Sequence, residues 1–274
     1  MIKRIYNKIT IFLQVVKESK KSGRFFWAQV LAKTGLCNFF IIKMNGYKLH
    51  FAPSSLSITL FSNPEDRDQD EEFLKRLLRE GDVYVDVGAN IGTLSFCAAQ
   101  LVGDTGKVIA IEAHPKTFSY LSKNVALNDF TNISLLNYAV GNKDGMLTFS
   151  DINSDDQNKV VTGLVRGIAV PVKKLDVLLQ HQSNITLLKI DVEGFEKFVI
   201  EGAAEVLQRT DMVFFESWDK NFDTYGYTTG DIISLLESMQ FSIYKMFDKQ
   251  YTIINSSYCS LNCENLLALK KRVQ

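Results

Sequence analysis

The chain has 274 residues, enough for one α/β domain with a substantial core. Its composition, 46% hydrophobic and 23% charged, is that of a soluble globular protein and excludes the disordered and membrane-spanning classes. The formal net charge of zero gives no overall attraction for a polyanion, so we expect no nucleic-acid partner.

The amino-terminal segment is basic and amphipathic. Residues 1–33 contain eight Lys or Arg and one acid, Glu18. Within residues 1–19 the apolar side chains recur at spacings of three and four, which predicts a helix with one apolar face. A helix of this kind packs on its own domain or lies on an anionic membrane. We expect packing, and peripheral membrane contact is the alternative.

Two short segments after it predict a β-hairpin. Residues 47–51 and 57–61 alternate as strands do, around a turn at 52–55. With the amphipathic helix they form an expected N-terminal extension, residues 1–70, ahead of a main domain at 71–274. The acidic run 63–73, with six acids and one Arg, is typical of a solvated helix entrance. The chain has no apolar run of about 18 residues and no signal-peptide pattern, so we expect a cytoplasmic protein.

From residue 71 helices and strands alternate. The expected helices are 71–80, 92–102, 115–128, 195–209 and 228–240; the expected strands are 83–87, 106–113, 132–140, 145–151, 167–175, 185–192, 211–217, 241–247, 250–254 and 264–270. Continuous apolar strands alternating with helices predict an α/β fold, with a mainly parallel sheet and helices on both faces. The four cysteines are expected to be reduced thiols, because no CxxC pair or nearby His completes a zinc site.

The turn in VYVDVGANIGTLS, residues 83–95, stands where a nucleotide-binding turn would be. Gly88, Asn90 and Gly92 make it compact, but the middle glycine of the dinucleotide fingerprint GxGxxG is absent. Asp86 precedes the turn and would face the negative charge of a pyrophosphate, an unfavourable pairing. It suits a ligand with a cationic group, such as the ammonium and sulfonium of S-adenosylmethionine (SAM).

Polar residues also follow the later strands. Glu112 ends the strand 106–113, where an acid can accept hydrogen bonds from ribose hydroxyls. Tyr138 and Ala139 end the next strand, where an adenine would lie, although ordinary packing explains Tyr138 equally well. Three acids follow the strand 185–190 around a glycine: Asp191, Glu193 and Glu196. They would lie at the mouth of the site, although for Glu196 an exposed carboxylate at the start of a helix is the ordinary alternative.

Four segments resemble the FkbM-type family of SAM-dependent methyltransferases: VYVDVGANIGTLS, IEAHP, NYAVGNKDG and LLKIDVEGFE. The resemblance extends from about residue 71 to the strand 264–270. It implies a class I methyltransferase (Rossmann-like) fold with a seven-stranded sheet. The implied reaction is O-methylation of a hydroxyl on a sugar, glycolipid or other natural-product-like small molecule. We expect the cofactor to contact Asp86, Gly88, Ala89, Asn90, Gly92, Glu112, Ala113, His114, Tyr138, Ala139 and Asp191.

Methyl transfer requires an aligned acceptor and, for a hydroxyl, a group that relieves its proton. The candidate catalytic bases are Asp191, Glu193 and Glu216, the last at the end of the strand 211–217. Asp191, Glu216 and Asp219 could instead share Mg²⁺, because carboxylate oxygens suit it. Three aromatic residues could stack on a sugar, form a lid or simply pack: Trp218, Tyr225 and Tyr227.

Three other functions remain open. A DNA amino-methyltransferase would carry an Asn/Asp-Pro-Pro-aromatic motif where this chain has DVEG. A dinucleotide-dependent oxidoreductase would bind NAD and tolerate the loss of Asp86. A non-catalytic protein that binds SAM, or docks by its basic helix, would tolerate Asp191→Asn. We favour the enzyme, because three strand ends carry polar groups suited to one ligand. The sequence indicates neither the acceptor nor the oligomeric state.

Overall fold

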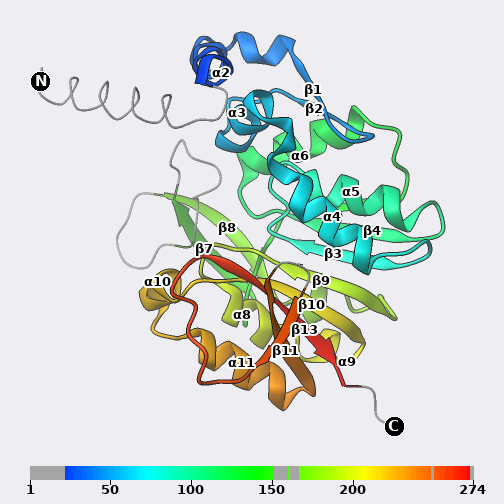
Figure 1. The fold of residues 1–274 in the computed structure, drawn as a ribbon, viewed down its shortest axis with the longest axis vertical. Helices are drawn as coiled ribbons and strands as arrows, with labels where there is room; N and C mark the ends of the chain where they lie inside the picture. Colours follow the sequence, from blue (N-terminus) through cyan, green and yellow to red (C-terminus); the bar gives the residue numbers. More distant parts are fainter. Residues whose placement is uncertain (1–21, 151–159, 161–166, 248–249, 272–274) are drawn as a thin grey trace, which may run out of the picture.

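The computed structural model describes residues 22–150, 160, 167–247 and 250–271. An eight-stranded sheet forms its centre, in the order β12-β11-β13-β10-β9-β3-β4-β5 (Figure 1). The strands are β3 (Val83–Val87), β4 (Lys107–Ile111), β5 (Ile133–Leu136), β9 (Ile185–Ile190), β10 (Thr210–Ser217), β11 (Phe241–Phe247), β12 (Gln250–Ile254) and β13 (Glu264–Lys270).

Five neighbouring strands run parallel, in the order β10-β9-β3-β4-β5. β13 is antiparallel to both β10 and β11, and β12 extends the edge beyond β11. The expected α/β fold is therefore confirmed, but the sheet is mixed and has eight strands where seven were expected. The carboxyl ends of β3, β4, β9 and β10 lie at one edge, where ligands bind in such sheets.

Helices cover both faces of the sheet (Figure 1). One face packs against α4 (Asp68–Leu77), α5 (Thr93–Val102) and α6 (Pro115–Ala126). The other packs against α7 (Leu175–Leu178), α8 (Glu196–Glu201), α9 (Ala204–Gln208) and α11 (Thr229–Ser238). Alternation along β3 explains the two layers, since Val85 and Val87 face one core and Tyr84 the other.

The predicted helix 195–209 is two helices. Gly202 lies between α8 and α9, against the carbonyl oxygen of Gly141, where a side chain would not fit. Its own carbonyl accepts from the Asp176 amide (3.1 Å), and the Asp176 carboxylate accepts from the Val206 amide (2.8 Å). These contacts end the first helix and cap the second.

A second sheet interrupts the β–α alternation. It contains β6 (Ala139–Val140), β8 (Gly167–Lys173) and β7 (Gly145–Ser150), in that order. The predicted strands 145–151 and 167–175 are confirmed as β7 and β8, which pair antiparallel. The predicted strand 132–140 is divided between the two sheets, and this turns Tyr138 and Ala139 towards the small sheet.

The amino-terminal unit, residues 22–62, contains α2 (Ser22–Thr34), η1 (Leu36–Phe39), β1 (Ile41–Lys43), β2 (Lys48–His50) and α3 (Ser55–Ser62). The predicted strand 57–61 is wrong: it lies in α3, whose first turn is capped by Ser54 Oγ accepting from the Ser57 amide (3.1 Å). Leu56 and Leu60, four residues apart, face the core. β2 pairs instead with β1.

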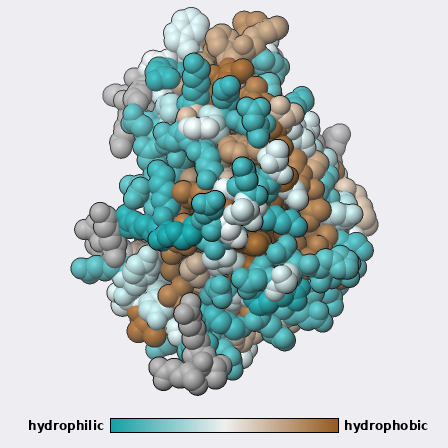
Figure 2. All heavy atoms as spheres, turned by 90° about the vertical axis from the view of Figure 1, so that its right-hand side faces the viewer, coloured by the Kyte–Doolittle hydropathy of each residue, from teal (hydrophilic) through white to brown (hydrophobic). Residues whose placement is uncertain are grey.

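The unit shares a core with the main domain, because Ile91 and Phe96 pack among its apolar side chains. The boundary at residue 70 stays a proposal. The predicted helix at 1–19 lies outside the described residues. No helix in the described part of the chain is long and apolar enough to cross a bilayer. Apolar residues reach the surface at the upper end of the molecule and in the middle of the face that Figure 2 shows.

The acidic run is not wholly solvated. α4 follows η2 (Pro64–Arg67), and within it Glu71 is 1% exposed. Glu71 accepts from Tyr47 Oη (2.8 Å) and from Asn45 Nδ2 (2.9 Å). It therefore joins the β1–β2 hairpin to the main domain. Of the thiols, Cys37 and Cys97 are buried, and Cys259 and Cys263 are exposed; all four are free.

Candidate active site

The turn after β3 is held against two other strands. The amides of Gly88 and Ala89 donate to the carbonyl of Ile111 at the end of β4 (2.9 and 3.0 Å). On its other side a Cβ at Gly88 would overlap the carbonyl oxygen of Asp191, just after β9. Gly88 and Asn90 both have positive φ, 82° and 50°. Glycine is therefore required at 88 by both its conformation and its surroundings.

A pocket opens at this turn, at the carboxyl ends of β3, β4, β9 and β10. Eleven of the residues expected from the sequence line it: Asp86, Gly88, Ala89, Asn90, Glu112, Ala113, Tyr138, Ala139, Asp191, Glu193 and Glu216. Gly92 and His114 lie outside this lining. A side chain at Gly92 would meet Leu121 of α6 and Phe96 of α5, so this glycine allows the close packing of the two helices here. His114 is 3% exposed and precedes α6.

Glu112 is held in place at one end of the pocket. Its two carboxylate oxygens accept from the amides of Asn90 (2.9 Å) and His114 (2.9 Å). Burial raises the pKa of Glu112 to about 7, against the two amide hydrogen bonds, which lower it. Asn137 donates to the carbonyls of Glu112 and Ala113 and keeps the strand end in place.

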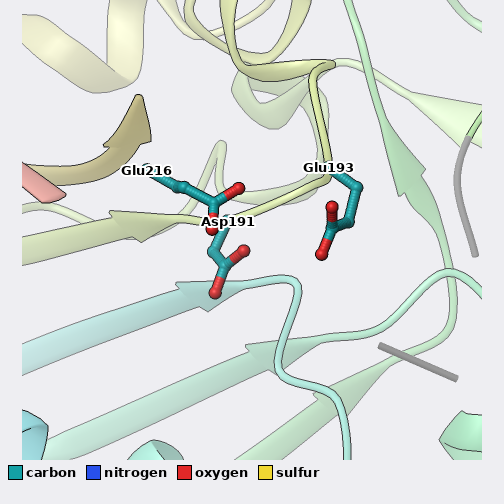
Figure 3. A group of neighbouring side chains, drawn as sticks. All are labelled: Asp191, Glu193 and Glu216. Atoms are coloured by element: carbon teal, nitrogen blue, oxygen red, sulfur yellow. The ribbon is translucent and has the colours of Figure 1, made fainter. Parts of the chain in front are cut away.

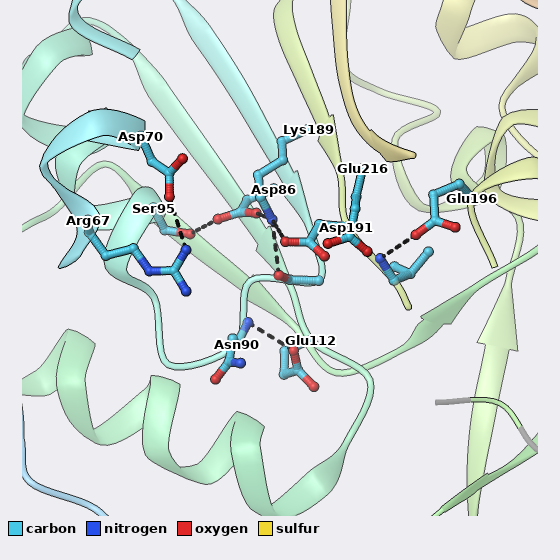
Figure 4. Close-up of polar contacts among 12 residues, drawn as sticks. Arg67, Asp70, Asp86, Asn90, Ser95, Glu112, Lys189, Asp191, Glu196 and Glu216 are labelled. Carbon is cyan, nitrogen blue, oxygen red and sulfur yellow. Dashed lines mark hydrogen bonds and ion pairs between the residues drawn. The ribbon is translucent and has the colours of Figure 1, made fainter. Parts of the chain in front are cut away.

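Lys189 joins two of the predicted acids and was missed in the sequence. Its ammonium donates to Asp86 Oδ1 (3.0 Å) and to the Gly88 carbonyl (3.2 Å), and lies 3.4 Å from Asp191 Oδ2 (Figure 4). Ser95 Oγ donates to the other oxygen of Asp86 (2.6 Å). A cation within the apolar run ITLLKI was the available signal, because a buried Lys is rare without a partner.

The neighbouring carboxylates keep Lys189 protonated. Lys189 is 6% exposed and Asp86 is 1% exposed. Burial by itself would lower the pKa of Lys189, but the carboxylates of Asp86 and Asp191 outweigh it and hold that pKa above its usual value. Asp86 therefore already has a cationic partner within the protein.

Three carboxylates converge beside this network (Figure 3). Oxygen atoms of Asp191, Glu193 and Glu216 lie within 4.8 Å of one another. Burial, and then the charge of Asp191, raise the pKa of Glu216 to about 7. Glu193 stands on a tight turn with φ of 54°, before Gly194 at 96°. The three candidate bases are thus brought together from β10 and from the turn after β9.

Asp219 is not part of this group. Its carboxylate accepts from the amides of Thr229 (2.8 Å) and Ser260 (2.6 Å). The alternative magnesium set of Asp191, Glu216 and Asp219 is therefore not brought together; the carboxylates that converge are those of Asp191, Glu193 and Glu216. The donor oxygens suit a hard cation, and Lys189 already supplies positive charge to Asp191.

Glu196 is buried, not exposed. It is 0% exposed and accepts from the amides of Val192 (2.9 Å) and Gly194 (3.3 Å). Burial raises its pKa to about 8. Its carboxylate shapes the turn that carries Glu193. The alternative of a surface carboxylate is wrong because the chain folds back over it, bringing Tyr227 Oη to 3.5 Å.

Arg67 is a second pocket residue that was missed. It comes from η2, far from the strand-end motifs, and lines the pocket on the side of the turn (Figure 4). Its Nη1 donates to Asp70 (3.0 Å), while its buried Nε has no hydrogen-bond acceptor among the described residues. The acidic run around it concealed it in the sequence.

The three aromatic residues considered for contact with the acceptor are not in the pocket lining, and they contact other parts of the chain. Tyr227 is 4% exposed and stacks on Phe222 with ring centroids 4.6 Å apart. Tyr225 donates to the Val160 carbonyl (2.7 Å), and Lys220 lies over Trp218 (5.1 Å). The pocket wall is made instead by Phe149 and Phe195, among other residues.

The family model for the methyltransferase FkbM domain matches residues 86–243. The chain belongs to this family. It is 28% identical over 183 residues to the hexuronic acid methyltransferase AglP of Haloferax volcanii, covering 64% of this chain and 73% of that protein. It is also 29% identical over 156 residues to methyltransferase sdnD of Sordaria araneosa, with 44% and 60% covered.

Among solved structures, the methyltransferase FkbM of Methylobacillus flagellatus matches with a TM-score of 0.45 and 14% identity, over 78% of this chain and 54% of that one. The expected family is confirmed, and the chain is a methyltransferase.

Proposed function

We propose that the chain transfers the methyl group of SAM to a hydroxyl oxygen of a sugar or a sugar-containing small molecule. The observation that carries this is the pocket itself. It places Glu112 at one end and the converging carboxylates Asp191, Glu193 and Glu216 at the other. The first group suits a ribose and the second an acceptor that must lose a proton.

The charge of the pocket favours SAM over a dinucleotide. Five carboxyl side chains and two cationic ones, Lys189 and Arg67, line it. An excess of carboxylates attracts a ligand with a sulfonium and an ammonium, and opposes a pyrophosphate. Because Lys189 already neutralises Asp86, we assign the attraction for the cofactor's ammonium to the whole group of acids and not to Asp86 alone.

Arg67 is the proposed partner for the methionyl carboxylate of SAM. The ammonium of Lys189 has three acceptors already, Asp86, Gly88 and Asp191. Arg67 retains an Nε without an acceptor in the described structure. A guanidinium can hold a carboxylate through two parallel hydrogen bonds. Arg67→Lys should weaken SAM binding about tenfold or more in calorimetry, and removing the methionyl carboxylate from the ligand should abolish this difference.

Glu216 is the proposed base. Its pKa of about 7 is near the value at which a general base is most effective. Asp191 is paired with Lys189 and Glu193 lies on the turn, so we assign them to orienting the acceptor. If a divalent cation occupied the three carboxylates, it would bind the acceptor oxygen and make it more acidic. Turnover that stops with a chelator and returns with Mg²⁺ would favour the metal.

The direct test combines binding and product analysis. Calorimetry should show SAM binding and no NAD binding, and Glu112→Gln should weaken the binding of SAM. Saccharides with neutral hexoses or hexuronic acids would then be offered as acceptors, since the relative AglP is named for hexuronic acid. A methyl ether survives mild alkali, whereas a methyl ester is hydrolysed. NAD binding, or an alkali-labile product, would contradict the proposal.

A further inference from the structure

Six of the eleven large apolar side chains exposed in the described structure lie within 16 residues of one another. They are Phe26, Trp27, Leu36, Phe39, Phe40 and Ile41, here called the aromatic patch. Phe39 is 84% exposed and Trp27 is 62% exposed. They belong to α2, η1 and β1, at the upper end of the molecule in Figures 1 and 2. Exposed apolar groups gathered in this way mark an interaction surface.

The patch stands on a well-packed base. Ala28, Cys37 and Ile42 alternate with its members along the chain and are at most 4% exposed. α2 packs on α3, and Phe40 meets Phe61 with ring centroids 6.1 Å apart. The outward direction of the aromatic side chains is therefore set by the fold of the unit.

The segment of the chain that carries the patch is positively charged. Residues 22–64 contain Arg24, Lys33, Lys43 and Lys48, and no Asp or Glu. Over residues 1–64 the sequence has ten of the 31 Lys and Arg but one of the 31 Asp and Glu. The remainder of the chain has the opposite excess. The charge distribution therefore attracts this end of the molecule to an anionic surface.

We propose that the aromatic patch docks the protein on the interface of an anionic lipid bilayer. Trp and Phe beside Lys and Arg is the composition that binds at the headgroup level, where the rings enter and the cations stay at the phosphates. A second copy of the chain is disfavoured, because a two-fold contact through this patch would bring two positive surfaces together. This proposal is independent of the proposed reaction.

Flotation with vesicles tests it on the full chain. Wild type should float with vesicles of phosphatidylcholine and phosphatidylserine, and at least tenfold less with phosphatidylcholine alone or in high salt. The double variant Trp27→Ser/Phe39→Ser should lose at least tenfold in binding. Met146→Ser/Leu261→Ser is the matched control, because these side chains are 63% and 80% exposed elsewhere. It should bind as wild type does.

Fluorescence gives a second readout. The chain has two tryptophans, so Trp218→Phe leaves Trp27 as the reporter. Its emission should shift to the blue with anionic vesicles and be quenched by brominated lipid. The proposal fails if wild type does not float, or if the patch variant floats as well as the control. It also fails if sedimentation shows a dimer that the patch substitutions dissociate. SAM calorimetry on the same variants shows whether the pocket is intact.

Discussion

Lys189 determines the charge balance of the site, because its ammonium pairs with two carboxylates that come from different parts of the chain. Asp86 comes from β3 and Asp191 follows β9, and without a cation between them the two acids would repel. The pair with Asp86 is buried on both sides, while Asp191 is 41% exposed. The charge balance of the buried site therefore depends on this one ammonium.

Lys189→Met should destabilise the protein by about 3 kcal/mol, since it leaves a buried carboxylate unpaired. Denaturant unfolding measures this. Asp86→Asn in the same chain should restore part of the loss, because the uncompensated charge is then gone. A double variant whose loss equals the sum of the losses of Lys189→Met and Asp86→Asn measured alone would show that the Asp86–Lys189 pair has no coupling.

Glu216→Gln should lower kcat about 100-fold or more and leave SAM binding nearly unchanged. In wild type kcat/KM should rise with pH up to about 7, because the carboxylate form accepts the proton and the pKa of Glu216 is near that value. In the variant this limb should disappear. Methylation of a carboxylate acceptor, which has no proton to lose, would be insensitive to the change. An unchanged rate with a hydroxyl acceptor would remove Glu216 as the base.

At the scale of elements, the site depends on two turns that bring backbone together. The turn after β3 meets the end of β9 at Gly88, and the turn after β9 is shaped by Glu196. Each turn begins at the carboxyl end of a parallel strand, so their hydrogen bonds also fix the register of the side chains that line the pocket. Changes in either turn should affect both folding and binding.

Gly88→Ala should destabilise the protein by more than the free-energy cost of placing a side chain at a positive φ, because the new Cβ would also overlap the Asp191 carbonyl oxygen. It should also abolish SAM binding. Gly226→Ala is the matched control: Gly226 has a similar φ of 74° but open space around it. The control should cost about 1–2 kcal/mol, the penalty of a left-handed conformation. Thermal unfolding and calorimetry compare them. Equal losses in the two variants would contradict the close approach at Asp191.

Glu196 should make stability depend on pH. In the folded protein the pKa of Glu196 is raised to about 8. Between the ordinary pKa of a glutamate and pH 8, the folded state therefore holds a proton that the unfolded state has released. The contribution is present below about pH 4 and is lost as pH rises towards 8. Glu196→Gln should remove this part of the slope in denaturant unfolding between pH 5 and 8. A slope identical to wild type would show that Glu196 is ionised throughout.

At the scale of the whole molecule, opposite charges are separated between the amino-terminal unit and the rest of the chain. The zero net charge conceals this separation. The acidic pocket and the basic unit nevertheless meet, since Leu56 of α3 lines the pocket. The unit is thus part of the site wall as well as a separate surface.

The sequence by itself determined the family, the β–α alternation and the strand ends that meet at the pocket. These depend on local pattern: apolar runs, a compact turn and acids at or directly after the ends of strands, as at Asp86, Glu112 and Asp191. Parallel strands place their carboxyl ends at one edge, so local order was sufficient.

Only the tertiary structure decided which charges meet. Lys189 reaches Asp86 across 103 residues of sequence, Arg67 enters the pocket from η2, and Glu196 is covered by a later helix layer. Residues 57–61 form a helix because the cap that Ser54 provides to the Ser57 amide, and the burial of Leu60, outweigh the strand-like alternation of the sequence. Such outcomes depend on burial and on partners distant in the chain, which no local pattern contains.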